Sequence, residues 1–312
     1  MRQYLAEDLI QVVRDRVVTG QAATEGTQDA DILRVINDEA LGRLYNAVMH
    51  CREEYYVHTT KQTMTAGTVR YRIPHRAMQT KIRDLFYWDA SGNRCKLLPI
   101  PREYRANITS TSSNQTVPSG YYFEGNHIVL HPDTSTCLTG TLEIAYFFRP
   151  GELVLSTSAR QITNVAGGLI TVDDDVPSTW TALLSYDIHS PHSGAEIKAW
   201  DLTASVVSAN QLTFASTAMD GSTSGTLAVE VGDWLCLAEE AALPGLPREW
   251  HPVLAQAAAA AILETVDPER FQLSVQVLER SIERMYAALS NRDDSYAEAI
   301  NISGSPFLIG GY

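Results

Sequence analysis

Two short segments hold the residue types that bind metal ions. The segment from Asp187 to His192 contains a carboxylate and two imidazoles, a donor set that suits zinc. It lacks a further ligand at a fixed spacing, and the Pro191 within it is typical of an ordinary turn. The run from Asp173 to Asp175 places three carboxylates side by side, but the glycine and the distal glutamate of a calcium loop do not follow it. We therefore expect both segments to be solvated turns and predict neither a metal site nor a cofactor.

Catalytic patterns are equally weak. The chain has no Gly-x-Ser-x-Gly elbow, and the glycines of residues 166–168 lie between two strand-like runs, with no helix after them to bind a phosphate. Pairs of carboxylates that could cleave a glycoside exist in any acidic β protein, and no pair stands out here. We therefore predict a protein that is not an enzyme.

The composition favours a folded protein that does not grip nucleic acid. The 312 residues are 45% hydrophobic and 20% charged, which is typical of globular proteins. The formal net charge is −13, whereas tight binding of phosphates needs clustered lysine and arginine. The four cysteines lie far apart, so we expect reduced thiols. We expect no signal peptide, because charges run through the N-terminal segment, and no membrane span, because the apolar runs fall far short of about 20 residues.

Helical periodicity marks the two ends of the chain. Apolar residues four apart from Leu5 to Val17 predict a first helix. Asp29 and Asp31 predict the first turn of a second helix, because carboxylates favour the positive end of the helix dipole, and apolar residues up to Val48 form its buried face. Two further helices are predicted, one after Pro247 and one after Asp267, and their closeness in sequence indicates an antiparallel hairpin.

The middle of the chain has the period of β-strands. Tyr71 alternates with Arg70 and Arg72, which indicates a half-buried strand. After residue 150 lysine and arginine become rare, and short runs rich in Val, Thr and Ser are separated by turn residues about every ten positions. This second pattern predicts a small β-sandwich or barrel in residues 151–244.

The fold class predicted from these parts is α+β: a helical bundle with a β-rich section and an inserted small all-β domain. We expect residues 1–150 and 245–296 to form the core, residues 151–244 the insertion, and residues 297–312 an extended C-terminal tail. The tail has no helical period but carries four large apolar residues: Phe307, Leu308, Ile309 and Tyr312. They either fold back on the core or dock on a neighbour.

The order of the parts from Val69 to Pro150 is distinctive. Its strand-like runs follow one another as Tyr71–Pro74, Ile82–Trp88, Cys95–Leu98, Gly120–Phe123, Ile128–Leu130 and Leu142–Pro150. A short basic segment, residues 75–81, separates the first two runs, and a turn from Asp89 to Asn93 separates the next two. With the alanine-rich helix, the Val-Asp-Pro break and the charged final helix near the C-terminus, this succession resembles the head-to-tail adaptor (connector) proteins of tailed bacteriophages.

The resemblance implies a structural virion protein at the head–tail junction, assembled in the host cytoplasm. It implies a homo-oligomeric ring, expected to be a dodecamer, that binds beneath the portal protein ring and extends the DNA channel. The ring would carry the downstream tail or nozzle protein. DNA would pass without tight or sequence-specific binding, and the acidic charge of the chain suits that role because it repels phosphates.

Three sets of contact residues are expected. The apolar residues of the tail would dock on the portal or on a neighbour. The C-terminal helices would supply ring contacts through Trp250, Ala257, Ala261, Arg280 and Arg284. A charged docking face toward an acidic partner ring would be built from Arg70, Arg72, Arg76 and Arg83, although an ordinary solvated sheet face fits these four equally well.

Two other functions stay open. The Ser-, Thr- and Gly-rich β section is compatible with a tail fibre or receptor-binding module, which would form trimers. A carbohydrate-active enzyme would need a cleft with converging carboxylates. Subunit number separates the first alternative from a portal-bound ring, and the structure of the β section separates the second.

Overall fold

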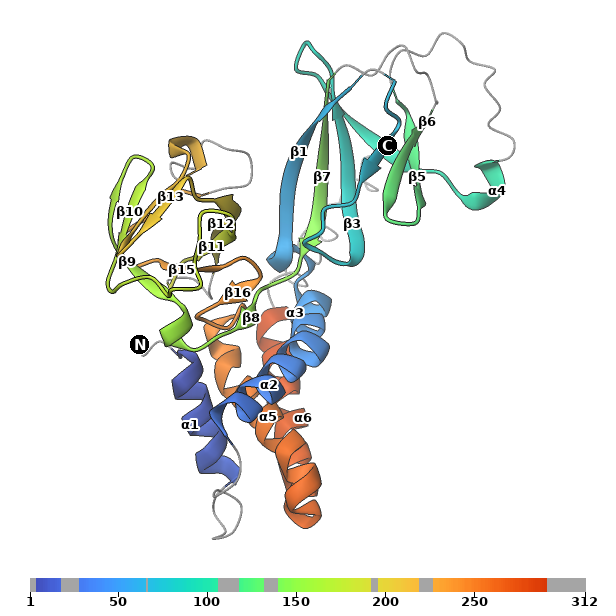
Figure 1. Cartoon of the computed structure of the whole chain (residues 1–312). Helices are drawn as coiled ribbons and strands as arrows, with labels where there is room; N and C mark the ends of the chain where they lie inside the picture. The colour runs from blue at the N-terminus through green and yellow to red at the C-terminus, as the bar shows by residue number, and fades with distance from the viewer. Residues whose placement is uncertain are drawn as a thin grey trace, which may run out of the picture. The chain divides into compact units, whose positions relative to one another are not determined.

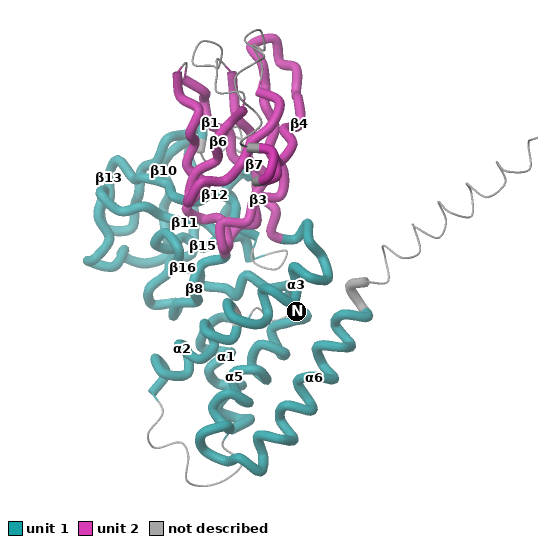
Figure 2. The backbone as a smooth tube through the Cα atoms, turned by 90° about the vertical axis from the view of Figure 1, so that its right-hand side faces the viewer, with its two compact units in different colours: residues 1–55, 150–222, 226–312 teal, residues 56–149, 223–225 magenta. Residues whose placement is uncertain are grey.

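The computed structural model describes residues 4–17, 28–65, 67–105, 118–131, 140–191, 196–218 and 227–290. The chain divides into two compact units (Figure 2). Unit 1 comprises residues 1–55, 150–222 and 226–312, and unit 2 comprises residues 56–149 and 223–225. Helices and several β-sheets occur in the same chain, so the predicted α+β class is confirmed.

The helices of unit 1 come from both ends of the chain. They are α1 (Ala6–Val17), α2 (Asp29–Glu39), the π-helical segment η1 (Ala40–Leu44), α3 (Tyr45–Cys51), α5 (His251–Val266) and α6 (Pro268–Ser290). Helix α5 contacts α1, α2 and α6, and α5 and α6 follow each other as the predicted hairpin (Figure 1). The side chains of Leu9 and Val13 on α1 and of Leu254 on α5 are fully buried, as expected for residues that form the apolar stripes.

The second predicted helix is interrupted, which corrects the expectation of a single helix up to Val48. Apolar residues exactly four apart drift by about 40° per step around an α-helix, because one turn takes 3.6 residues. The wider π-helical turn of η1 takes up this drift. Ile32 and Ile36 before it, and Leu44 and Val48 at its end and beyond, are consequently all buried.

Unit 2 is built on a seven-stranded sheet. Its strands are β1 (Val57–Met64), β2 (Arg70–Arg72), β3 (Ala77–Trp88), β4 (Arg94–Pro99), β5 (Gly120–Glu124), β6 (His127–His131) and β7 (Gly140–Phe148). The order is β1-β7-β3-β4-β5-β6-β2, and neighbours pair antiparallel except β4 with β5, which are parallel. A short helix, α4 (Arg102–Arg105), follows β4.

Strand β3 is longer than predicted. Its register on β7 shifts between Ala77 and Ile82, where Gln79 and Thr80 have φ of 50° and 57°. The basic segment expected before the aromatic strand therefore belongs largely to the same strand, since a bulge lets one strand bend without ending. The turn predicted at Asp89 is present: its carboxylate accepts hydrogen bonds from the backbone amides of Ser91 and Asn93, each at 2.8 Å.

The β section of unit 1 has a separate apolar core. Its strands are β8 (Glu152–Leu153), β9 (Arg160–Ala166), β10 (Leu169–Val172), β11 (Ser185–His189), β12 (Ile197–Thr203), β13 (Val206–Ser208), β14 (Gln211–Thr213), β15 (Trp234–Leu237) and β16 (Glu240–Ala241). Seven of them form a sheet in the order β12-β11-β15-β9-β10-β14-β13, and β16 pairs parallel with β8. Tyr186, Ile188, Leu212 and Leu235 are fully buried in the core between them.

Candidate functional site

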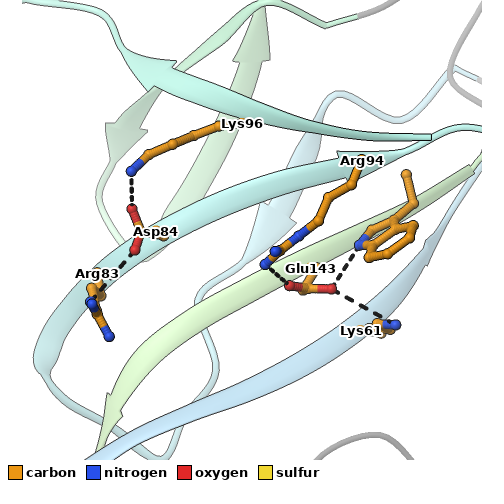
Figure 3. Close-up of polar contacts among 7 residues, drawn as sticks. Lys61, Arg83, Asp84, Arg94, Lys96 and Glu143 are labelled. Carbon is orange, nitrogen blue, oxygen red and sulfur yellow. Dashed lines mark hydrogen bonds and ion pairs between the residues drawn. The ribbon is translucent and has the colours of Figure 1, made fainter. Parts of the chain in front are cut away.

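One side of the unit 2 sheet gathers cations and aromatic rings. Lys61, Glu143, Phe86 and Lys96 lie opposite one another across β1, β7, β3 and β4, and Trp88 lies opposite Arg94 in the next row. Cross-strand partners project to the same side of a sheet, so these side chains share one surface. We call it the cation–aromatic face; its members are Lys61, Arg83, Asp84, Phe86, Trp88, Arg94, Lys96, Leu98 and Glu143. Figure 3 labels its six charged residues.

The other side of the same strands is the core of unit 2. Leu85, Leu97, Leu142 and Ile144 are at most 1% exposed. Because side chains alternate along a strand, burying these four directs the neighbouring cations and rings to the opposite side. The composition of the cation–aromatic face therefore follows from the pattern that builds the core.

Glu143 is the centre of the face. Its side chain is only 8% exposed, yet it accepts hydrogen bonds from Trp88 Nε1 at 2.7 Å and from an Arg94 guanidinium nitrogen at 2.5 Å. Lys61 Nζ lies 3.8 Å from the same carboxylate. In Figure 3, Lys61 and Arg94 both point toward Glu143. The hydrogen bonds and opposite charges offset the cost of burying the carboxylate, and they fix the orientation of the Trp88 ring and of the Arg94 side chain.

The cations of the face stack on its rings and remain accessible. The Arg94 guanidinium carbon lies 3.6 Å from the centroid of Phe86, and Lys61 Nζ lies 4.7 Å from the ring of Trp88. The side chains of Lys61, Arg94 and Lys96 are 41%, 46% and 56% exposed. Partly exposed cations held over rings present charge to a partner with little loss of side-chain freedom on binding.

A second carboxylate, Asp84, lies beside the first row. Lys96 Nζ approaches it at 2.5 Å and Arg83 Nε at 3.5 Å (Figure 3). The face thus carries four cations and two carboxylates, a formal charge of +2, in a chain whose net charge is −13. Leu98, which alternates with Lys96 on β4, adds an apolar side chain that is 62% exposed.

The four arginines expected to form a docking face lie in different places. Arg70 and Arg72 are exposed on the strand β2, and β4, β5 and β6 separate this strand from β3 in the sheet order. Arg70 forms an ion pair with Glu124 at 2.6 Å. Arg83 alone belongs to the cation–aromatic face. The structure therefore does not bring the four together on one surface.

Arg76, the fourth of them, is 1% exposed. Its guanidinium carbon lies 4.9 Å from the centroid of the Phe148 ring, and the ring of His58 lies 4.6 Å from that of Phe148. Burial and, to a lesser degree, the positive charge of Arg76 lower the pKa of His58 to about 4. This cluster stacks a buried cation on aromatic rings and keeps the imidazole neutral at physiological pH.

Sequence reasoning missed Lys61, Arg94 and Lys96, which supply most of the charge of the face. Arg94 and Lys96 alternate with the buried Leu97 after a recognisable turn, and this signal could have placed them on the outer side of β4. Lys61 and Glu143 could not be joined to them, because the register of β1 on β7 is not visible in a single sequence.

The residues expected at a ring interface differ in exposure. Trp250 and Ala257 are each 1% exposed, whereas Arg280 and Arg284 are exposed on α6 and Ala261 is half-buried. Two apolar residues of α6 that had not been singled out, Leu273 and Val277, are 65% and 50% exposed. The tail residues Phe307, Leu308, Ile309 and Tyr312 lie outside the described residues.

An open groove of about 510 Å³ lies between the segment η1–α3 and helix α6. Its lining includes Arg43, His50, Glu279 and Tyr286. The groove is shallow and wide, and among the residues that the structure describes no group of three or more His, Cys, Asp or Glu could hold a metal ion.

The expectation of two solvated turns is half right. Asp173, Asp174 and Asp175 are exposed after β10. Asp187 and His189, in contrast, lie within β11 and are 0% and 3% exposed, so the prediction of a solvated turn is wrong for them. The reason is local: the Asp187 carboxylate accepts backbone N–H groups from residues 201 and 239, both at 2.9 Å, which satisfies it inside the fold.

Charge pairs beside partly exposed rings, as on the cation–aromatic face, also occur at protein–protein interfaces. The family model described as SU10 adaptor protein matches residues 5–190, more than half of the chain. The chain therefore belongs to this family of phage head-to-tail adaptor proteins, and the resemblance seen in the sequence is confirmed. The match runs from α1 to the end of β11, so it includes the segment from Val69 to Pro150 that carried the resemblance but not the C-terminal helices that were also part of it.

A search of curated proteins gives no match. In the described part of the chain, no helix combines the length and the apolar character that crossing a bilayer requires.

Proposed function

We propose that this adaptor forms a ring beneath the portal at the head–tail junction of the virion, where it extends the DNA channel and presents a platform for the tail or nozzle protein. The observation that carries the proposal is the family match over residues 5–190. The protein acts through assembly and not through catalysis. The ring is a homo-oligomer, expected to contain twelve copies.

The domains of the predicted architecture serve this role. Residues 1–150 and 245–296 form the core of the adaptor, with the helices as a bundle, and residues 151–244 are a β domain inserted into it. Two observations fit this division, whereas the compact units group the β section with the helices and set residues 56–149 apart. Helices from both ends of the chain meet at α5, and the β section has its own buried core. Asn37 on α2 ties the start of the insertion to the helices, because its amide pairs with both the N–H and the C=O group of Leu153, at 2.8 and 3.0 Å.

The ring wall is built by the hairpin α5–α6. Its exposed side chains, among them Arg280, Arg284, Leu273 and Val277, are available for contacts with a neighbour, whereas the buried Trp250 and Ala257 hold the hairpin together. DNA passes the ring without tight binding, and the acidic charge of the chain favours this because it repels phosphates.

The tail residues 307–312 dock on the portal. Four large apolar side chains at the end of a chain are costly to leave in water and gain free energy when a partner covers them. Arg70 and Arg72, exposed on β2, provide a charged contact with an acidic partner ring.

The decisive experiment mixes the purified protein with portal rings from the same source and images the mixture by negative-stain electron microscopy. Ring-symmetric density at the narrow end of the portal is the expected result, and it makes the subunits countable.

A chain that ends after Ser303 should keep its fold by circular dichroism but lose portal binding. Bare portals beside free trimers would instead favour a fibre module, and unchanged portal affinity of the shortened chain would rule out docking by the tail.

A further inference from the structure

Formal charge is divided unequally between the two units. Unit 2 contains eleven Lys and Arg and six Asp and Glu, a net charge of +5. The whole chain has −13, so unit 1 carries −18. Residues 151–222 and 226–244 of unit 1 contain twelve Asp and Glu but only two Lys and Arg, a net charge of −10. One chain therefore contains both a part with a net positive charge and a part with a strongly negative one.

The anionic part has one segment that complements the cation–aromatic face in two respects. Residues 173–184, which we call the acidic loop, begin with three consecutive exposed aspartates. The same loop contains Leu183 next to its last residue, and this side chain is 93% exposed, the highest value among the large apolar residues of the described part of the chain. The face offers the matching pair of features: half-exposed cations and the exposed Leu98.

The acidic loop is held in place by the β section. Trp180 is 5% exposed and its ring packs against Tyr186 with centroids 5.3 Å apart. The backbone N–H groups of Asp173 and Val176 donate to the carbonyls of Gln161 and Ala209, at 2.9 and 2.8 Å. A loop fixed in this way loses little conformational freedom when it binds.

We propose that the acidic loop of one copy docks on the cation–aromatic face of the next copy. The aspartates pair with Arg94 and Lys96, and Leu183 packs against Leu98 at the edge of the face. The two surfaces are unlike each other, which is the kind of heterologous contact that closes a ring of identical subunits. A second copy of this chain is the partner that the charges favour, because it carries the required opposite charge. This inference rests on the proposed ring and names a second pair of surfaces that join its subunits, in addition to the hairpin α5–α6.

The test reverses the charge of each surface at exposed positions. The face variant combines Lys96→Glu and Leu98→Glu; Arg94 stays, because it holds Glu143. The loop variant combines Asp175→Lys and Leu183→Lys. Each variant should self-associate at least about tenfold more weakly than the parent chain at low salt, because like charges then face each other. An equimolar mixture should regain the affinity, since each variant then finds its opposite charge in the other and the ring alternates.

A matched control separates position from net charge. Lys81→Glu with Tyr104→Glu makes the same charge change on exposed residues of unit 2 that are not members of the face, and self-association should stay within about threefold of the parent. Native mass spectrometry of the free proteins, and of the proteins bound to portal rings, reads the association. Circular dichroism and hydrogen exchange check that each variant is folded.

Several outcomes would overturn the inference. The first is a face or loop variant that self-associates as strongly as the parent chain. The second is a mixture of folded variants that does not regain the affinity of the parent chain. The third is a parent chain that forms no contacts between copies, neither in solution nor on portal rings. If the face variant loses binding to duplex DNA while its self-association is unchanged, the face binds phosphates instead. If the face variant changes the hydrogen exchange of the acidic loop when both it and the parent chain are monomers, the loop contacts the face within one chain. If the mixture of variants regains self-association but the protein does not bind portal rings, this inference stands and the proposed function is refuted. If the protein binds portal rings but the mixture does not regain self-association, the proposed function stands and this inference is refuted.

Discussion

Replacing Glu143 tests whether the cation–aromatic face is held together from its centre. Glu143→Gln keeps the shape of the side chain but removes its charge. Trp88 and Arg94 donate to different oxygens of Glu143, whereas glutamine keeps only one acceptor oxygen. The half-exposed Arg94 can turn to water, so the loss of its bond costs roughly 1 kcal/mol. The ion pair with Lys61 adds less than about 1 kcal/mol, because the lysine is 41% exposed and water screens it. We expect a loss of about 1–2 kcal/mol in the free energy of unfolding of unit 2.

Glu143→Ala should cost more, about 3 kcal/mol, because it also leaves the Trp88 N–H group and the Arg94 guanidinium without their acceptor. Hydrogen exchange of the β3 and β7 amides during a urea titration measures unit 2 separately from unit 1, which matters because two units need not unfold together. The control is Glu124→Gln, an acid that is 53% exposed and paired with Arg70, for which we expect a change below about 0.5 kcal/mol. A Glu143→Gln variant as stable as this control would refute the reasoning.

Three further predictions concern stability. Burial lowers the pKa of His251 to about 4. The neutral imidazole therefore contributes about 3 kcal/mol to the free energy of unfolding above pH 6.5, and this contribution is lost as the pH falls from 6.5 to 4. In urea unfolding measured against pH, a His251→Gln variant should lose less stability over this range than the parent chain. In Gly140→Ala the new Cβ would lie 2.3 Å from a backbone oxygen at a φ of +153°, so unit 2 should lose more than about 2 kcal/mol in thermal unfolding, whereas Gly42→Ala, with open space, should be neutral or stabilising. Asn37→Ala should destabilise unit 1 by about 2 kcal/mol, because it leaves both backbone groups of the buried Leu153 unpaired, and faster amide exchange at Leu153 would report it.

Local patterns in the sequence predicted the elements well. The stripe from Leu5 to Val17, the carboxylates at Asp29 and Asp31, and the start of a helix after Asp267 all correspond to helices of the structure. These signals depend on neighbours within one or two turns, which a single sequence displays in full. The interruption by η1 was not predicted, because spacing by four residues fits both an α-helix and a helix with a π turn.

The candidate site depended on non-local information and was therefore mostly missed. Arg76 lies in a run of basic residues, and only the packing of Phe148 against it shows that its guanidinium is covered. Lys61 and Glu143 are 82 positions apart in the chain and meet only through the register of β1 on β7. Asp187 looked like a turn residue in its sequence context, and its burial follows from two backbone amides that other segments supply.

Side chains alternate along the strands of unit 2, and this alternation buries the core on one side. It also determines which residues of the cation–aromatic face can be substituted without destabilising the sheet. Strand β7 lies between β1 and β3, so the outward side of its centre is covered by neighbouring side chains, and a charge there needs partners on both sides. Glu143 has them in Lys61 and Arg94, which makes it a residue that supports the face and not one that a docking partner can reach. Lys96 and Leu98 lie on β4, are more than half exposed and contribute little to the buried network. Loss of assembly caused by changes at these two positions can therefore be assigned to the contact surface, whereas loss caused by a change at Glu143 could come from the stability of the sheet.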